Sequence, residues 1–437
     1  MIPKLYLLGF LLFFSPSICI FAQEDPLDSK RRKLVDTLTY ETQSGLPIAA
    51  SKIYFTDAKF TFSGFGETNF VNYRGSKNRG SSDLELYYTN LQRFVAYAAW
   101  KPVNWLVVYG EFFAEFLNDG SLESDFEYLP EFFLDFLLDE RLNVRVGTHQ
   151  PGIGFINNND EPIMFYSVNR PEAERLIIPS QWIDLGVTFY GTFQEKWKWS
   201  FGVFQGLDTE NLNGATWIRR GRDNALRFNF SSFVFNPKVV YQGIEDTEIS
   251  VSGLFTTMGR DHQVVMEEGP MGVDAQTRLL SAYVRHQRGN WNFMALGTYG
   301  QMRNTDRLYR FLNNSQVIGK EVYGGYVETS YNILPLLGFF PTEGKAKNPN
   351  GLFRKQEFQL PIFARLERLN THAGIHAQLQ SSPISQTDLT SLTVGANFNP
   401  RRNIVLKSNY QIRWNSQVLP DGSKEGNRIE MGLGFIF

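Results

Sequence analysis

Apolar and polar residues alternate along most of this chain with a period of two. In the last ten residues, RIEMGLGFIF, one face carries only large apolar side chains, whereas the other carries Arg428, Glu430 and two glycines. The segment IVLKSNYQIRW repeats the pattern, with Ser408 as the only polar residue on its apolar face. Successive side chains of a β-strand point to opposite faces, so this period predicts strands rather than helices.

About sixteen segments carry this pattern. Most are close to the roughly 9–11 residues that a tilted strand needs to cross a bilayer. Their predicted spans are 60–72, 90–100, 106–116, 131–137, 142–149, 183–193, 197–206, 226–242, 247–257, 278–287, 291–301, 321–333, 357–370, 388–399, 404–414 and 428–437.

The connections between these segments alternate between short and long. The short ones read KPVNW, DERL, QEKWK, GIED, RGN and NPRRN. The long ones cover 73–89, 117–130, 150–182, 207–225, 258–277, 302–320, 371–387 and 415–427. Residues 334–356 break the rule, because a short turn is expected there.

Two architectures fit one apolar and one polar strand face: a soluble sandwich and a membrane barrel. The alternation of turn lengths and the aromatic residues at strand ends, such as Trp105, Trp197 and Trp291, favour the barrel. Backbone groups in lipid must all be paired, and among strand structures only a closed barrel achieves this. We therefore predict an all-β, transmembrane antiparallel β-barrel of about sixteen strands, within a range of 14–18.

The polar strand faces then line the lumen, and they carry charges of both signs. A barrel of this width is too wide for wall side chains to fill, so the pattern predicts a hydrated channel. The alternative for any single residue is a charge that is merely solvated or paired with a neighbour. The predicted lumen-wall residues are Glu111, Glu115, Arg145, Arg227, Arg285, Arg365, Glu367, Lys407 and Arg413, on faces that also hold Glu67, Glu131, Asp135, Glu328, Arg428 and Glu430.

The third long connection, 150–182, is unusually apolar for a loop. It contains Phe155, Phe165 and Trp182 among other large side chains, so it is expected to pack against something. Its stretch RPEAERL predicts a short helix that starts near Pro171 and that Pro179 stops from continuing. The simplest arrangement folds the loop into the barrel mouth; the alternatives are an external cap and a subunit contact. An inward loop would narrow the pore with an electrostatic filter, whose candidate residues are Asp160, Glu161, Arg170, Glu172, Glu174 and Arg175.

The N-terminus has the layout of a secretory signal peptide. Lys4 precedes an uncharged run from Leu5 to Phe14, and Ala22 offers a cleavage point. A membrane anchor is the alternative, but the apolar run is short for a span. We expect a signal peptide at 1–22, a periplasmic N-terminal extension at 23–57 and the barrel at 58–437.

Composition and motif content argue against several other classes of function. The 437 residues carry a formal net charge of −2, which disfavours nucleic acid as the main partner. The only cysteine, Cys19, lies in the predicted signal peptide, so neither disulfides nor a thiolate metal site are expected. The five histidines form no credible metal site, and no Ser–His motif, P-loop or dinucleotide fingerprint is present. We therefore expect neither an enzyme nor a cofactor.

The same loop carries a resemblance to a known family. The run GIGFINNNDEPIMFYSVNRPEAERLIIPSQW resembles the central signature of the phosphate-selective porin O/P-like family of Gram-negative outer membranes. The matching residues are Gly152, Gly154, Asn157, Glu161-Pro162, Arg170-Pro171-Glu172, Ile177-Ile178-Pro179 and Trp182, with weaker similarity at 322–334 and 363–371. The final Phe437 also resembles the assembly signal of outer-membrane barrels. The predicted lumen faces carry no ladder of lysines, so the resemblance does not by itself establish phosphate as the solute.

The resemblance implies a passive porin in the outer membrane, assembled as a homotrimer. The residues and the resemblance together predict passive diffusion of ions and small polar solutes, anion or phosphate related, with membrane lipid and lipopolysaccharide around the barrel. The alternative from another class is a structural or adhesive surface barrel with a closed lumen. An outer-membrane lipid enzyme is disfavoured by the missing Ser–His motif.

Overall fold

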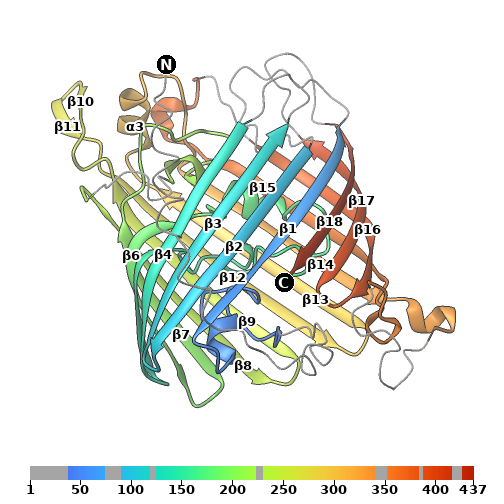
Figure 1. Cartoon of the computed structure of the whole chain (residues 1–437). Helices are drawn as coiled ribbons and strands as arrows, with labels where there is room; N and C mark the ends of the chain where they lie inside the picture. Colours follow the sequence, from blue (N-terminus) through green and yellow to red (C-terminus); the bar gives the residue numbers. More distant parts are fainter. Residues whose placement is uncertain are drawn as a thin grey trace, which may run out of the picture.

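Sixteen antiparallel strands close into a single barrel (Figure 1). The computed structural model describes residues 38–73, 90–118, 125–222, 230–339, 352–382, 387–415 and 426–437. Each strand pairs with its neighbours along the chain, and the barrel closes where β1 pairs with β18, with Phe65 opposite Ile436. The prediction of a sixteen-stranded transmembrane barrel is confirmed.

The strand bounds follow the sequence pattern closely. The wall strands are β1 (Phe60–Tyr73), β2 (Asn90–Val103), β3 (Leu106–Asn118), β4 (Asp125–Asp139), β5 (Leu142–His149), β6 (Asp184–Phe193), β7 (Trp197–Gln205), β8 (Phe233–Ile244), β9 (Thr247–Met258), β12 (Ala275–Arg288), β13 (Trp291–Met302), β14 (Glu321–Asn332), β15 (Pro361–Gly374), β16 (Asp388–Arg401), β17 (Ile404–Asn415) and β18 (Arg428–Ile436). A separate hairpin of β10 (Gln263–Met266) and β11 (Gly269–Gly272) belongs to the connection between β9 and β12.

Four predicted strand starts differ from the structure by three residues or more. One of them is the start of β12, which begins at Ala275 rather than at residue 278. Strand β4 begins at Asp125, six residues before the predicted start, because pairing with β3 continues through Pro130, which sits opposite Phe112. Strand β8 begins at Phe233, so residues 230–232 of its predicted span are not strand. Strand β15 begins at Pro361 rather than at residue 357. In each case neighbouring strands, not local composition, decide how far pairing extends.

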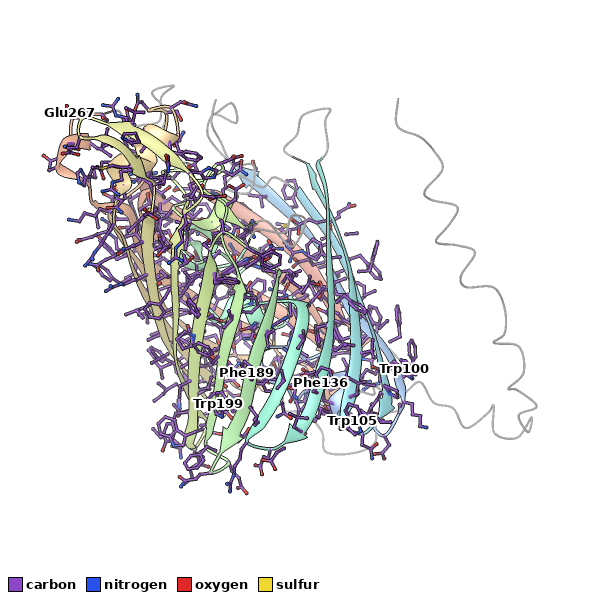
Figure 2. The ribbon with its side chains drawn as sticks, turned by 90° about the vertical axis from the view of Figure 1, so that its left-hand side faces the viewer. Trp100, Trp105, Phe136, Phe189, Trp199 and Glu267 are labelled. Carbon is purple, nitrogen blue, oxygen red and sulfur yellow. The ribbon has the colours of Figure 1, made fainter. Side chains whose placement is uncertain are left out.

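The alternation sorts side chains to the two faces as predicted. Along β12, buried and exposed residues alternate without a break from Ala275 to Tyr283. The outward face of β18 exposes Ile429, Met431 and Leu433, whereas Arg428 and Glu430 face inward and are buried. Figure 2 shows Trp100, Trp105, Phe136, Phe189 and Trp199 toward the short-turn end of the barrel, where an interfacial aromatic girdle is expected.

Short turns join the strands at one end of the barrel and long connections join them at the other. Gly289, in the short turn between β12 and β13, has a φ of +59°, which favours glycine. The connection from β14 to β15 lies at the short-turn end although it runs from residue 333 to 360, and it contains η5 (Leu334–Leu337) and η6 (Lys355–Glu357). The irregular segment expected at 334–356 is therefore an insertion that leaves the strand count unchanged.

Three segments fold into the barrel. The crossing loop (residues 150–183) contains η3 (Ile156–Asn158) and α2 (Glu172–Leu176), the short helix expected after Pro171. The second inward loop (residues 206–222) contains η4 (Arg219–Gly221). The N-terminal segment (residues 38–57) contains η1 (Lys52–Phe55) and lies within the barrel at its short-turn end (Figure 1). The prediction that the third loop folds inward is confirmed.

Two apolar clusters lie inside the barrel rather than outside it. One joins the two inward loops to the inner faces of wall strands from β7 to β16, with Trp182 and Trp217 among its members. The other joins the N-terminal segment, through Ile48 and Ile53, to inward residues such as Phe65 on the first strands. The remaining helical elements, α3 (Thr305–Phe311) and η7 (Ala377–Leu379), lie in connections at the long-loop end. Within the described part of the chain, none of the helices has the length and apolar character to span a membrane.

Candidate functional site

Glu172 tethers the crossing loop to the opposite wall of the barrel. Its carboxylate lies 2.5 Å from Arg413 on β17 and 3.4 Å from Arg428 on β18, and 2.5 Å from Arg175 of its own helix. Its backbone N–H donates to the carboxylate of Glu367 on β15 at 2.7 Å. Burial disfavours the charged form, yet the three guanidinium groups hold the pKa of Glu172 well below its ordinary value. The tether is therefore ionic at neutral pH.

A second tether holds the crossing loop against β15 and β17. The ammonium group of Lys407 donates to the backbone oxygens of Phe165 and Ser167, at 2.8 and 3.0 Å. Arg365 donates to the Ser167 hydroxyl, and Asn409 accepts the N–H of the next residue at 2.8 Å. The loop joins β5 to β6, and β15 and β17 lie on the far side of the closed barrel from these two strands. The loop therefore reaches across the lumen.

Glu174 organises the crossing loop itself. One carboxylate oxygen accepts the backbone N–H groups of Phe155 and Ile156, each at 2.7 Å, and the other accepts the hydroxyl of Tyr326 on β14. Burial raises the pKa of Glu174, against the effect of these donors. Both carboxylate oxygens of this predicted filter residue are therefore already hydrogen-bonded, one to the loop backbone and the other to the barrel wall.

The remaining predicted filter residues lie nearer the N-terminal segment. Arg170 and Asp160 approach each other at 3.7 Å within the crossing loop, and both are buried. Glu161 accepts the backbone N–H groups of Ala49 and Ile48, at 2.6 and 3.1 Å. The structure thus brings the six residues into one interior region, where Glu161 joins the crossing loop to the N-terminal segment.

Further polar contacts seat the N-terminal segment on the inner wall. Tyr54 donates its hydroxyl to Asp135 on β4 at 2.7 Å, and Gln43 donates to the hydroxyl of Tyr190 on β6 at 3.1 Å. Asp135 is also paired with Arg145 of β5 at 2.9 Å. The described residues before position 58, expected as a periplasmic extension, therefore occupy the lumen.

The predicted lumen-wall charges point inward, but inward segments cover most of them. Arg285 is partly exposed and lies 3.7 Å from Glu248, whereas Arg227 lies outside the described residues. The others are buried: Glu111, Glu115, Arg145, Arg365, Glu367, Lys407 and Arg413. The described residues of this set lie on the inward side of their strands, where most of them meet an inward segment rather than water.

Arg93, which was not among the predicted lumen residues, is the centre of a buried ion-pair cluster. Arg93 on β2 lies 2.8 Å from Glu67 on β1 and 2.5 Å from Glu115 on β3. Its inward neighbours along the strand, Val95 and Tyr97, are apolar. A single arginine on an otherwise apolar inner face is the signal that could have identified it, since such a charge requires a partner.

The second inward loop was also not anticipated. Trp217 is fully buried and donates its indole N–H to the backbone oxygen of Gly319 at 3.1 Å. Arg219 donates to the Ser180 hydroxyl at 3.0 Å, and Arg222 donates to the backbone oxygen of the same serine. The tryptophan and basic residues of TWIRRGR, unusual for a solvated loop, could have indicated this packing.

A polar cavity of about 100 Å³ remains between the N-terminal segment, the crossing loop and the wall. Cations outnumber anions among its lining side chains, which include Arg145, Lys198, Lys238, Arg285 and Glu248. Lys238 donates to the side-chain oxygen of Asn158 in the crossing loop at 3.2 Å. The cavity lies toward the short-turn end, because Lys198 and Glu248 are each within three residues of a short turn.

The contact between Glu161 and the N-terminal segment should depend on pH. Burial raises the pKa of Glu161 from its ordinary 4.5 to about 8, although backbone N–H groups oppose this and nearby Asp160 adds to it. The seated segment therefore favours protonated Glu161, so seating is strongest below pH 4.5 and weakens as the pH rises from 4.5 to about 8. We expect single-channel conductance to rise between about pH 5 and pH 8 in wild type. The variant Glu161→Gln should show no such rise; the same rise in both proteins would assign the titration elsewhere.

Among the described residues, no group of three or more His, Cys, Asp or Glu side chains could hold a metal ion.

Comparison with known proteins bears on the fold. No protein-family model matches the chain. An uncharacterized protein of Aquifex aeolicus is 23% identical over 393 residues, which cover 87% of this chain and 81% of that protein.

The solved structures that share the architecture include DcaP and OmpF. The outer membrane channel DcaP of Acinetobacter baumannii is 14% identical with a TM-score of 0.50, covering 86% of this chain and 97% of that one. OmpF of Salmonella typhi, in a complex with daunomycin, is 9% identical with a TM-score of 0.51 and the same coverage. The chain therefore has the fold of the porins and channels of Gram-negative outer membranes, and its exposed apolar outer face is that of a membrane-spanning β-barrel.

Proposed function

We propose that this protein is a channel of a Gram-negative outer membrane that lets ions and small polar solutes diffuse through a narrowed lumen. The observation that carries the proposal is a closed barrel of sixteen strands whose inner face holds charged residues and whose interior retains a polar cavity. No bond is made or broken. The rate is set by the space left by the inward segments, and the selectivity by the charges beside it.

The six loop residues Asp160, Glu161, Arg170, Glu172, Glu174 and Arg175 are proposed as the narrow part of this path. Their burial and mutual pairing support a fixed constriction. We also propose a preference for anions. Arg145 in the cavity lining is neutralised by Asp135, and the other charged lining residues are Lys198, Lys238, Arg285 and a single acid, Glu248. Phosphate is one candidate solute, on the resemblance of the crossing loop. A homotrimer, surrounded by outer-membrane lipid and lipopolysaccharide, is proposed on the same resemblance.

A second candidate function is a closed surface barrel. It is favoured by the two apolar clusters inside the barrel and by the burial of most lumen charges. In that case the inward segments would act as a permanent plug, and the protein would serve as a structural or adhesive element.

Single-channel recording in a planar bilayer with a salt gradient separates the two functions. Steady conductance steps with a reversal potential on the anion side are expected for the proposed channel. The double variant Lys198→Gln, Lys238→Gln should move the reversal potential toward cations, whereas Lys196→Gln, in an exposed turn, should leave it unchanged. Absence of conductance from protein shown to be folded and inserted would favour the closed barrel. Chemical crosslinking in the membrane tests the trimer independently.

A further inference from the structure

The long insertion at the short-turn end carries apolar side chains that the described chain does not cover. We call its described residues, 333–339 and 352–360, the lateral knob. It projects sideways from the barrel below β14 and β16, in orange in Figure 1. Leu336 and Leu337 are 71% and 66% exposed, and Leu352 and Phe353 are exposed as well. Four large apolar side chains together on one protruding connection would be unfavourable in water.

The lateral knob is held firmly against the outside of the wall. The ring of Phe358 packs between Phe339 and Phe398, with ring centroids 5.7 and 5.5 Å apart. Backbone bonds in both directions join Gln359 to Asn399 at the end of β16. Phe398 belongs to the outward face of its strand, because its inward neighbour Asn397 is buried. The knob is therefore continuous with the lipid-facing surface of the barrel.

The position of the lateral knob along the wall matches the edge of the membrane. Its chain leaves β14 just after Tyr331, whose ring lies 4.6 Å from that of Trp291 on β13. Such aromatic pairs near strand ends mark the boundary between acyl chains and headgroups. The chain re-enters the wall just before Ile362, which is exposed on the outer face. Side chains that project sideways from this level meet lipid.

The charges around the lateral knob favour phosphate groups. Arg354 and Lys355 lie in the knob, and Arg401 and Arg402 form the adjoining turn between β16 and β17. Glu357 is the one acidic residue in the described parts of the knob and this turn, and it is already bonded to Arg354 at 2.8 Å. The guanidinium of Arg402 stacks on the ring of Tyr40, 4.5 Å from its centroid. Lys355 and Arg401 are thus the cations left next to the apolar side chains, an arrangement that suits a phospholipid surface.

We propose that the lateral knob binds the periplasmic leaflet of the outer membrane. Its leucine and phenylalanine side chains insert among acyl chains, and its cations contact headgroup phosphates. The insertion thereby anchors one side of the barrel at a fixed depth. This inference is independent of whether the lumen conducts.

Depth measurements with single spin labels test this proposal. Replacing Cys19 with Ser removes the only natural cysteine, after which Leu337→Cys carries a nitroxide label in full-length protein in phosphatidylethanolamine–phosphatidylglycerol vesicles. Phe132→Cys, on the outer wall of β4, is the membrane reference, and Val265→Cys, on the 78% exposed residue of β10, is the water reference. We expect the Leu337 label to resemble the Phe132 label rather than the Val265 label, with high accessibility to oxygen and low accessibility to a water-soluble nickel complex.

Two outcomes would overturn the proposal. Nickel accessibility equal to that of the Val265 label would place the knob in water. Dipolar broadening that disappears on dilution with unlabelled protein would show that a second copy covers it. If Leu337→Cys does not fold, Phe353→Cys provides the same measurement. Replacing the exposed Lys355 with Glu should reduce the depth of the label in anionic vesicles, whereas Lys196→Glu in a distant turn should not; equal effects of the two would refute the role of phosphate groups.

Discussion

Removal of residues 23–57, with the predicted signal peptide retained, should raise single-channel conductance by at least about twofold, since a barrel of this size is too wide for wall side chains to fill. The N-terminal segment covers the inward residues Phe65, Tyr97 and Phe133, which would then face water. Its contacts to Glu161 and Asp135 would also disappear, so the crossing loop would lose one side of its support.

Two further variants show whether the effect comes from this contact. Glu161→Ala, with the segment present, should give unstable steps between the wild-type and truncated conductances. Glu268→Ala, in the exposed turn of the β10–β11 hairpin, should behave as wild type. Identical conductance in truncated and wild-type protein would place the N-terminal segment outside the conducting path.

Replacement of Glu172 with Ala should have the largest effect on the crossing loop. Three buried arginines would lose their shared carboxylate, and breaking a buried ion pair by removing one partner costs about 3–5 kcal/mol. We expect the heat-induced gel-mobility shift of the folded barrel to occur at a lower temperature. We also expect the reversal potential to move toward anions, because positive charge is left beside the path.

Glu172→Gln is the informative companion variant, since it keeps the shape and one hydrogen-bond acceptor but not the charge. It should lie between wild type and Glu172→Ala in stability and match the alanine variant in selectivity. Glu268→Ala again serves as the surface control. An unchanged reversal potential in both Glu172 variants would exclude this network from the selectivity filter.

The sequence by itself determined the wall of this protein. The period-two pattern identified the strands, the alternation of turn lengths identified the two ends, and the apolar content of residues 150–182 identified the inward loop. These features are local or nearly local, because lipid outside and a charged interior impose opposite requirements on successive residues. Even the start of helix α2 could be predicted, from Pro171 and the acids that follow it.

Only the tertiary structure decided how the interior is filled. The ion pair between Glu172 and Arg413 joins residues 241 positions apart, and no local pattern specifies which wall charge a loop carboxylate meets. The same holds for the N-terminal segment, which reads as an extension in the sequence but is buried against the first strands. Its one signal was that the inner faces of those strands, with Val95, Tyr97 and Tyr109, are themselves apolar. An apolar inner wall requires a covering segment, but periodicity cannot say which segment that is, because the choice depends on long-range packing.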